Sequence, residues 1–520
     1  MTEAHEAVVK ILAIGVALLG LWFVGRSATD GRRRRVVLAG LASLGALSYF
    51  NFGAFHTDGT PLHIWDQYHY VIGSKYFPEL GYDGLYVATV AAFEEKDPAY
   101  PSPERMRDLR TGVIVPSATL DDFKHEVRGR FSNERWNSFR SDATHFYIRP
   151  EIFLDNGYLG TPAEVAVDRV FTAHLPFRQA TALLFAAIDI FLLGVGGWIV
   201  YRVFGLEILA AVSLILGLGY CSRFYWVGGA FLRYDWVIAL IVCAAALERR
   251  RGKIAGAALA YAICTRVYPA LMLLPLGAYA LAHRRSALHL PVRQFASGLV
   301  IAAVVLLAAG CLVGHGPGVW LESAQRLLEH GSVVAPNAIG LRIPLSASLA
   351  NLRGDLLDPE TLYAYGDISR DFALTAHDHL VWIILATACV LTLALRAAWK
   401  TEDGVVAFVS GIMVMYALTT PMGYYGTYFL LLGLIRPIRS ASVFLICNAL
   451  MFVTAGAVLM LSNHGVIRLN GAAVYVPVSV LLIVVSIDWL LHVERADPDS
   501  SLESGHQRDG LLVRSSSRSC

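Results

Sequence analysis

The sequence predicts an all-α protein that crosses a membrane many times, and three observations support this fold class. First, 56% of the 520 residues are hydrophobic and the mean hydropathy is +0.52. Second, only 16% are charged, whereas soluble chains carry roughly 25% charged residues. Third, many apolar runs approach the length of about 20 residues that a helix needs to cross a ~30 Å hydrocarbon core. This composition excludes a disordered or nucleic-acid-binding protein and disfavours a soluble enzyme.

We expect about thirteen transmembrane helices (about 11–13) from these runs. The range reflects short runs that meet at Arg266 and at Pro421, which could be broken or half-length helices. The runs are 8–25, 36–55, 179–201, 206–221, 235–247, 254–266, 268–283, 294–313, 379–396, 404–420, 424–436, 440–462 and 472–493.

Basic residues in the short loops give the orientation, because Lys and Arg collect in cytoplasmic loops. When Arg32–Arg35 is placed in the cytoplasm, the loop Arg249–Lys253 and most other basic short loops fall on the same side. The N-terminus then lies outside. The expected location is a bacterial inner (plasma) membrane, with the functional site facing the periplasm or the outside.

Under this topology the chain divides into six parts. Both long outer loops are expected to carry short helices that lie along the membrane surface. The parts are two N-terminal transmembrane helices (1–55), a first extracytoplasmic loop (56–178), transmembrane helices (179–313), a second extracytoplasmic loop (314–378), C-terminal transmembrane helices (379–493) and a cytoplasmic, disordered tail (494–520).

The first outer loop begins with a group of residues suited to acid–base chemistry. If a helix starts near His63, then Asp66, His69 and Tyr70 lie on one face, at i, i+3 and i+4. A carboxylate with an imidazole and a phenol beside it could take a proton from a hydroxyl. The alternative is an aromatic belt at the membrane interface, in which Asp66 only caps a helix.

Two charged groups lie at the outer ends of later spans. Arg233 and Asp235 stand close to the apolar boundary, where they could bind a ligand, pair with each other or extend toward water. Arg266 is the only charge in an apolar stretch and precedes Tyr268 and Pro269. Because proline breaks the helix there, Arg266 could hold a lipid phosphate in a polar cavity. The alternative is a short outer loop whose Arg touches lipid head groups.

Two further polar groups fall on the same outer side. Asn337 and Arg342 lie in an apolar, Pro- and Gly-rich part of the second outer loop and could face a pocket. Tyr424 and Tyr425 follow Pro421 in a helix-breaking turn, although tyrosines at such a place are by default interfacial anchors. The shared placement of all these groups on the outer side favours one common site.

In this order of features the chain resembles the GT-C superfamily of integral-membrane glycosyltransferases. Asp66, with Tyr70 four residues later and the segment Gly81–Tyr86 beyond, is similar to the first-loop pattern of the polyprenol-phosphate-mannose-dependent mannosyltransferases. The basic loop Arg249–Lys253, followed by Thr265–Pro269, resembles their basic loop and Lys-Pro segment. Asn337 and the turn from Pro421 to Tyr425 are similar to their later loops.

The resemblance implies a GT-C-like fold and an inverting sugar transfer from a polyprenyl-phosphate donor, with Asp66 as general base. It implies that Arg266, with Arg233, stabilises the phosphate that leaves. The acceptor would be a hydroxyl of a glycan, lipid or protein. No metal or other cofactor is expected, because a single Asp66 replaces an Asp-x-Asp motif.

Two other functions remain open from the residues alone. Many spans with broken helices and buried charges are also typical of a secondary transporter of a polar or lipid-linked solute. A lipid-linked glycan ligase or polymerase would share the location and the donor type. The absence of an internal repeat and the one-sided placement of the polar groups favour the transferase over the transporter.

Overall fold

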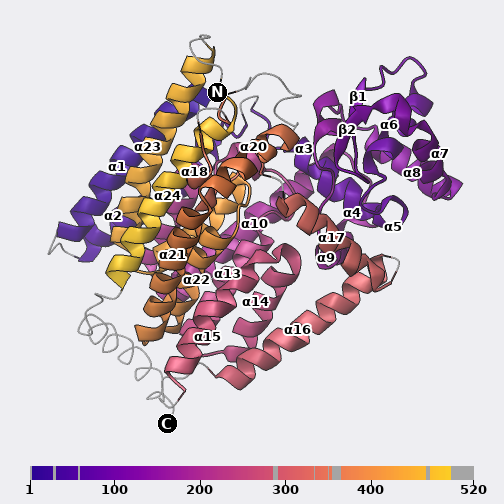
Figure 1. Cartoon of the computed structure of the whole chain (residues 1–520). Coiled ribbons are helices and arrows are strands. Elements are labelled where there is room, and N and C mark those ends of the chain that lie inside the picture. Colours follow the sequence, from indigo (N-terminus) through magenta and orange to yellow (C-terminus); the bar gives the residue numbers. More distant parts are fainter. Residues whose placement is uncertain are drawn as a thin grey trace.

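The molecule consists mainly of helices, most of which run side by side in one bundle (Figure 1). The computed structural model describes residues 3–26, 31–56, 59–284, 291–314, 316–332, 334–348, 351–353, 365–463 and 469–493. The expected tail at 494–520 lies outside the described residues.

Six of the described helices are long and apolar enough to cross a membrane. They are α1 (Glu3–Arg26), α10 (Gln179–Phe204), α16 (Val292–Val313), α21 (Leu380–Lys400), α23 (Pro437–Asn463) and α24 (Ala472–Val493). The mainly helical, membrane-type architecture predicted from composition is therefore confirmed.

Each of the other expected spans also falls on a helix, but these helices are shorter or more charged. They are α2 (Gly31–Tyr49), α11 (Leu206–Leu218), α13 (Asp235–Glu248), α14 (Gly252–Arg266), α15 (Leu273–Ala282), α22 (Gly404–Leu418) and a 3-10 helix (Gly423–Leu434). A helix of 13 to 15 residues, such as α11 or α14, rises only about 20 Å, less than the ~30 Å core. The number of thirteen spans therefore stays a prediction.

Glycines allow some of the bundle helices to approach each other closely. A Cβ at Gly256 of α14 would lie 2.0 Å from the carbonyl oxygen of Phe295 in α16, and a Cβ at Gly298 of α16 would lie 2.0 Å from that of Lys253. Any larger side chain would force these two helices apart. Small residues at such contacts are typical of helices that pack within membranes, where close van der Waals contact drives association.

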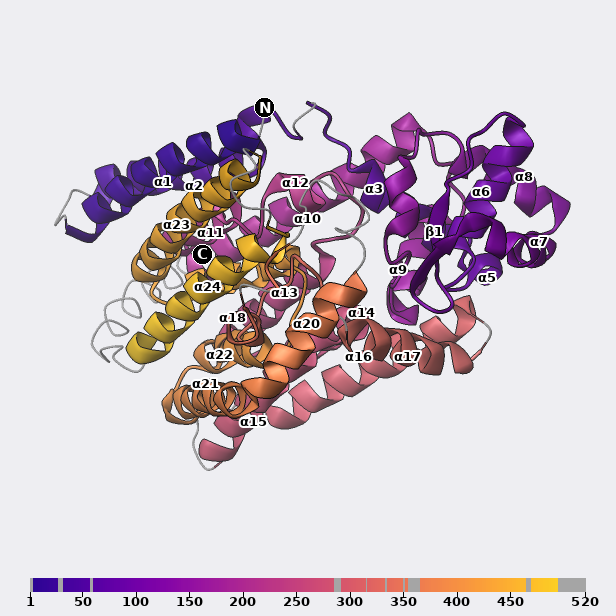
Figure 2. The ribbon, with the colours of Figure 1, turned by 45° about the horizontal axis from the view of Figure 1, so that its top comes forward.

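The first outer loop folds into a packed body at one end of the bundle, away from α1, α2 and α23 (Figures 1 and 2). Its helices are α3 (Ile64–Gln67), α4 (Gly73–Lys75), α5 (Phe77–Leu80), α6 (Leu85–Lys96), α7 (Asp121–Gly129), α8 (Asn133–Ala143) and α9 (Pro162–Thr172), with a π-helical turn at Tyr68–Ile72 and 3-10 helices at Ser117–Leu120 and Pro150–Leu154. The body has its own hydrophobic core, which includes Trp136, Phe139 and Phe153.

A small sheet corrects the expectation of helices alone. Strands β1 (Arg105–Asp108) and β2 (Val113–Pro116) pair antiparallel, with Arg105 opposite Pro116 and Asp108 opposite Val113. In β1 Arg105 is exposed and the next three residues are buried, and Met106 packs into the hydrophobic core of the loop.

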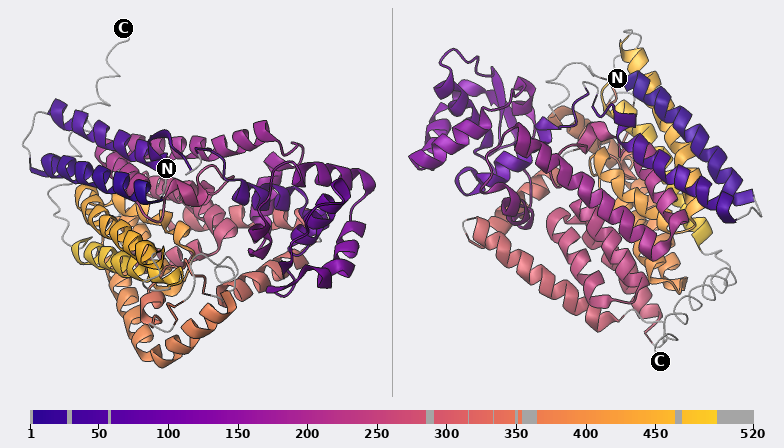
Figure 3. Two further views of the ribbon diagram at one scale, coloured as in Figure 1. Left: turned by 90° about the horizontal axis from the view of Figure 1, so that it is seen from above. Right: turned by 180° about the vertical axis from the view of Figure 1, so that it is seen from behind.

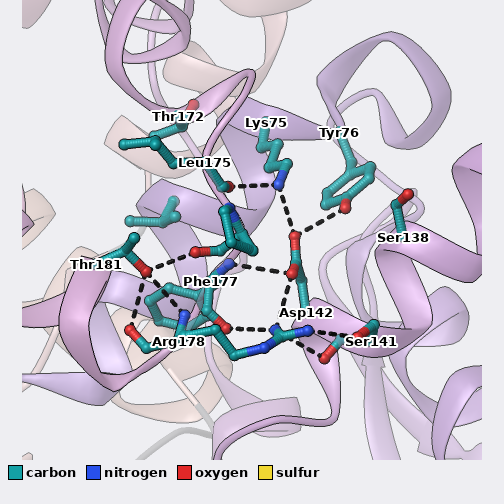
Figure 4. A network of polar contacts seen from close by, with 12 residues as sticks. Lys75, Tyr76, Ser138, Ser141, Asp142, Thr172, Leu175, Phe177, Arg178 and Thr181 are labelled. Atoms are coloured by element: carbon teal, nitrogen blue, oxygen red, sulfur yellow. Dashed lines mark hydrogen bonds and ion pairs between the residues drawn. The ribbon is translucent and has the colours of Figure 1, made fainter.

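A buried ionic network joins this body to the first helix that follows it (Figure 4). The Asp142 carboxylate of α8 accepts hydrogen bonds from Lys75 Nζ (2.7 Å), the Tyr76 hydroxyl (2.9 Å), the Phe177 amide (3.0 Å) and Arg178 Nη1 (3.0 Å). The side chains of Lys75 and Asp142 are only 7% and 3% exposed. Because unpaired buried charges are costly, this network fixes α4, α8 and the start of α10 relative to one another.

The second outer loop is also helical where it is described. It contains α17 (Gly318–Ser332), α18 (Arg342–Leu345) and α20 (Tyr365–Asp378), and the bundle side adds short turns at α12 (Phe224–Val227), Asn51–Gly53 and Tyr268–Met272. Helix α17 follows α16 and contacts the first outer loop, where Arg326 Nη1 donates to the Leu109 carbonyl oxygen at 2.6 Å. Two further views show the arrangement of the helices (Figure 3). The second outer loop therefore contains helices, as expected, and their placement along a membrane surface stays a prediction.

Candidate functional site

Asp66 and Tyr70 contact the same guanidinium group, which belongs to Arg233. His63 caps α3, because its Nδ1 accepts a hydrogen bond from the Asp66 amide (3.1 Å). Asp66 lies in the first turn of this helix. Asp66 Oδ2 is 3.3 Å from Arg233 Nε. The Tyr70 ring centre lies 4.1 Å from the central carbon of the same guanidinium, a cation–π contact. The predicted proximity of Asp66 and Tyr70 is therefore present.

His69 does not share this position, which corrects the predicted common face. The chain forms a π-helical turn at Tyr68–Ile72, and this wider turn changes the angular spacing that an α-helix would give. His69 is buried, with Nδ1 2.9 Å from the Trp65 carbonyl oxygen and Nε2 2.9 Å from the Tyr86 hydroxyl. Burial lowers its pKa below the ordinary 6.5. His69 therefore stabilises the core of the outer loop, and both its nitrogens are occupied by protein groups.

A third carboxylate holds the backbone of Arg233 in place. Asp189 of α10 accepts the Arg233 amide on both oxygens (3.1 and 3.0 Å) and the Tyr234 amide on Oδ1 (3.3 Å). These amides precede α13 and have no partner within a helix, so Asp189 acts as a cap supplied from a neighbouring helix. Asp189, to which the sequence alone assigned no role, thereby directs the Arg233 side chain toward Asp66.

Asp235 lies two residues further on but does not pair with Arg233. Its Oδ2 accepts the Tyr261 hydroxyl of α14 at 2.6 Å, and the side chain is buried. Asp235 therefore links the start of α13 to α14, next to the end of α14 that carries Arg266.

Arg266 forms a buried ion pair with Glu164 of α9. The contact joins Arg266 Nη1 to Glu164 Oε2, and each side chain is only 4% exposed. Thr161 brings the two helices together, since its hydroxyl accepts the Glu164 amide (3.1 Å) and donates to the Cys264 carbonyl oxygen (2.6 Å). Beyond Arg266 the backbone of Val267 has a φ of 53°, which ends α14 and turns the chain into the next segment.

Four tyrosines surround the two arginines. The Tyr424 ring centre is 5.4 Å from the Arg233 guanidinium, and Tyr425 lies 4.6 Å from Tyr424 and 5.3 Å from Tyr268, measured between ring centres. Tyr70, between the two ion pairs, interacts electrostatically with Arg233, Arg266 and Glu164. The predicted residues Tyr70, Tyr268, Tyr424 and Tyr425 therefore lie in one place.

These residues form one unit, which we call the arginine–carboxylate cluster. Arg266 interacts electrostatically with Arg233 as well as with Glu164 and Asp235, so the two ion pairs are neighbours. The cluster comprises Asp66, Tyr70, Glu164, Asp168, Arg233, Asp235, Arg266, Tyr268, Tyr424 and Tyr425. Asp66 and Arg266, distant in sequence, are thus linked through Arg233, and their action in one common site stays a prediction.

Several buried polar atoms of the cluster have no hydrogen-bond partner among the described residues. On the donor side they are Arg233 Nη1, Arg266 Nε, Arg266 Nη2 and the Tyr268 hydroxyl. On the acceptor side they include Glu164 Oε1 and Asp235 Oδ1. An unpaired buried polar group costs about 1–3 kcal/mol, and more when charged. Asp66 Oδ2 is a further acceptor without a hydrogen-bond partner among the described residues. This concentration of unpaired donors and acceptors favours a place where a polar ligand binds.

Asp168 lies one helical turn after Glu164 and is also buried. Burial, followed by the charges of Glu164 and Asp235, raises the pKa of Asp168 well above its ordinary 3.8. The Tyr158 hydroxyl donates to Asp168 Oδ2 at 3.3 Å. Within the ranges described above, no three His, Cys, Asp or Glu side chains are arranged to hold a metal ion.

The two residues predicted from the second outer loop lie apart from the charges. The Asn337 carbonyl oxygen accepts the Gly423 amide at 2.7 Å, which joins this loop to the turn that carries Tyr424 and Tyr425. Its main chain thus supports the cluster. Arg342 starts α18 with an exposed side chain. The prediction that Arg342 faces the same pocket receives no support from its position.

Sequence reasoning missed Glu164, Asp168 and Tyr261. Glu164 follows Thr161 and Pro162 in a pattern typical of a helix start. Because helix capping explained an acid at this position, its ion pair with Arg266 could not be expected from the sequence. The spacing of Glu164 and Asp168 at i and i+4 placed two acids on one helix face, which helix capping alone does not require. That spacing was the available signal.

Comparisons of this chain with protein-family models, with curated proteins and with solved structures found no match to any of the three.

Proposed function

We propose that this protein is a membrane glycosyltransferase that moves a monosaccharide, mannose or another hexose or pentose, from a polyprenyl-phosphate donor to an acceptor hydroxyl. One observation carries the proposal. Buried guanidinium nitrogens of Arg233 and Arg266 have no hydrogen-bond partner among the described residues, the two arginines interact electrostatically, and Arg233 pairs with Asp66. Guanidinium groups bind phosphate oxygens in a bidentate manner, and their charge is strongest where water is excluded.

In the proposed reaction Asp66 accepts a proton and the two arginines stabilise the leaving phosphate. The acceptor oxygen attacks the anomeric carbon, and its proton passes to the Asp66 carboxylate. The bond between that carbon and the phosphate oxygen breaks, and its electron pair stays on the phosphate. Arg266 and Arg233 stabilise the added negative charge. Attack opposite the leaving phosphate inverts the anomeric centre.

Differences in exposure fit these roles. The Asp66 side chain is 15% exposed, whereas Arg233, Arg266 and Glu164 are 3–4% exposed. Asp66 is therefore the charged member of the two pairs that an acceptor can reach from water. The arginines lie deeper, where the phosphate of a lipid anchored in the membrane would enter between helices.

The proposed placement puts the cluster on the extracytoplasmic face of a bacterial inner or plasma membrane. It rests on the bias of Lys and Arg toward the opposite loops, including Arg32–Arg35 and Arg249–Lys253. The prenyl chain of the donor would lie among membrane lipids. A glycan, lipid or protein acceptor would approach past the first outer loop.

An Asp66→Asn variant tests the proposed base. The substitution keeps the side-chain shape and removes proton acceptance, so transfer should fall by about 10²-fold or more, the usual contribution of a general base. The full chain in liposomes is supplied with polyprenyl-phosphate donors of several radiolabelled sugars, and label in acceptors is measured. Asp83→Asn is the matched control, because Asp83 pairs with Arg130 at 3.1 Å within the outer loop, away from the cluster.

Two results would contradict the proposal. One is transfer retained in the Asp66→Asn variant at the rate of the Asp83→Asn control. The other is movement of an unaltered solute across the liposome membrane by wild-type protein without any sugar transfer, which would indicate a transporter instead.

A further inference from the structure

The pair of Glu164 and Arg266 satisfies only part of what each side chain can bind. The contact uses Arg266 Nη1 and Glu164 Oε2. Arg266 Nε and Nη2 and Glu164 Oε1 are buried and have no partner among the residues that the structure describes. A bidentate pair would use two parallel hydrogen bonds. Glu164 therefore neutralises Arg266 without filling its donors.

The backbone of Glu164 is fixed while its side chain is not. Thr161 accepts the Glu164 amide and donates to the Cys264 carbonyl oxygen, so the first turn of α9 is attached to the last turn of α14. The second carboxylate oxygen, Glu164 Oε1, has no hydrogen-bond partner among the described residues. Withdrawal of the carboxylate from Arg266 therefore breaks none of the hydrogen bonds that attach α9 to α14.

A second partner for the withdrawn carboxylate lies one turn along α9. Burial favours the neutral form of Asp168, since its pKa is raised well above 3.8. A protonated carboxyl group is a hydrogen-bond donor. Tyr158 faces Asp168 from the preceding loop, Asp235 from α13 and Arg266 from α14. Glu164 can thus exchange a cationic partner for a neutral one inside the same cluster.

We propose, on the basis of the function given above, that Glu164 is the resident counter-ion of Arg266 and that the phosphate of the lipid-linked donor displaces it on binding. The phosphate supplies the oxygens that Arg266 Nε and Nη2 lack. Glu164 also sets selectivity. A lipid with a neutral head group cannot replace the charge of Glu164, because a bare buried guanidinium is costly. Glu164 is thus a specificity-determining residue and not the base.

A Glu164→Gln variant tests this role. Removing the competing charge should tighten binding of a polyprenyl monophosphate by about 10-fold or more, a change of about 1.4 kcal/mol, and leave binding of the matching polyprenol unchanged. The purified full chain in detergent is titrated with each lipid, and Kd is measured. Glu126→Gln is the matched control, because Glu126 pairs with Arg130 on the exposed side of the outer loop.

A second variant keeps the test decisive if Glu164→Gln does not fold. Glu164→Asp retains the charge but shortens the side chain, so it weakens the contact with Arg266 and should tighten phosphate binding by a smaller factor. Equal or weaker binding of polyprenyl monophosphate in a folded variant overturns the proposal, as does equal tightening for polyprenol.

The outcomes also separate this inference from the proposed function. If wild-type protein transfers sugar in an Asp66-dependent manner and Glu164→Gln does not tighten phosphate binding, only the counter-ion role fails. If neither wild type nor variant binds polyprenyl monophosphate and no sugar is transferred, both fail. Binding seen in Glu164→Gln but not in wild type supports the counter-ion role, even where no donor sugar is accepted.

Discussion

Arg233 shows how one side chain joins distant parts of the chain. Its backbone amide is held by Asp189, its Nε lies 3.3 Å from Asp66, and its guanidinium stacks on Tyr70. The sequence indicated Asp66 and Tyr70 as candidates by their i, i+4 spacing and Arg233 by its place at the end of an apolar run. It could not indicate the pairing, because an ion pair between residues so far apart depends on how the helices pack.

Asp168 gives a prediction at the scale of a single residue. Its raised pKa means that the folded protein keeps a proton that the unfolded chain releases above pH 3.8. The stability that this proton gives is full below that pH and is lost as pH rises toward the folded pKa. Asp168→Asn, neutral at every pH, should therefore flatten the fall in Tm as the pH rises above about 4.

The measurement is thermal unfolding of the full chain in detergent across that range. Asp83→Asn, an outer-loop substitution away from the cluster, should keep the wild-type slope. If the Tm of the Asp168→Asn variant falls with pH as steeply as the Tm of the wild type, Asp168 does not carry the extra proton.

At the scale of elements, two helices show where sequence periodicity succeeds and where it fails. The sequence from Thr161 to Glu164 has a pattern typical of a helix start, and α9 begins at Pro162, where the Thr161 hydroxyl accepts a hydrogen bond from the Glu164 amide. The α-helical spacing after Asp66 predicted a shared face with His69, and the π-helical turn placed His69 in the loop core instead. A turn type set by tertiary packing is not encoded in local spacing.

Thr161→Ala tests the link between α9 and α14. Loss of an N-cap costs about 1 kcal/mol, and this variant also releases the Cys264 carbonyl oxygen that holds Glu164 opposite Arg266. We expect a lower Tm together with altered affinity for polyprenyl monophosphate. Ser132→Ala removes a similar cap, on the Arg135 amide of α8, and should lower Tm while leaving affinity unchanged. If Thr161→Ala binds polyprenyl monophosphate with the same affinity as Ser132→Ala, Thr161 only stabilises its helix.

At the scale of the whole molecule, composition was sufficient for the architecture but not for the count of spans. Every expected apolar run falls on a helix, and six helices are long and apolar enough to cross a membrane. The shorter ones, such as α11 and α14, need neighbours to satisfy their ends, which sequence length alone cannot reveal. The packed body and hairpin of the first outer loop also depend on contacts between segments that are far apart in sequence.

The cluster lies where that outer body meets the bundle. Its members come from α3 and the π-helical turn, from α9, from the start of α13, from the end of α14 and from the 3-10 helix at Gly423–Leu434. The proposed function needs such a junction, because a lipid donor arrives from the membrane and a polar acceptor from water. The division of the chain into six parts and the orientation stay predictions.

The most direct test is a density map of the wild-type full chain with a non-transferable polyprenyl-phosphonate sugar. We expect phosphonate oxygens within hydrogen-bond distance, about 2.7–3.2 Å, of Arg266 or Arg233, with the anomeric carbon of the sugar beside Asp66. A head group bound in a separate space, in contact with neither arginine, would contradict the account.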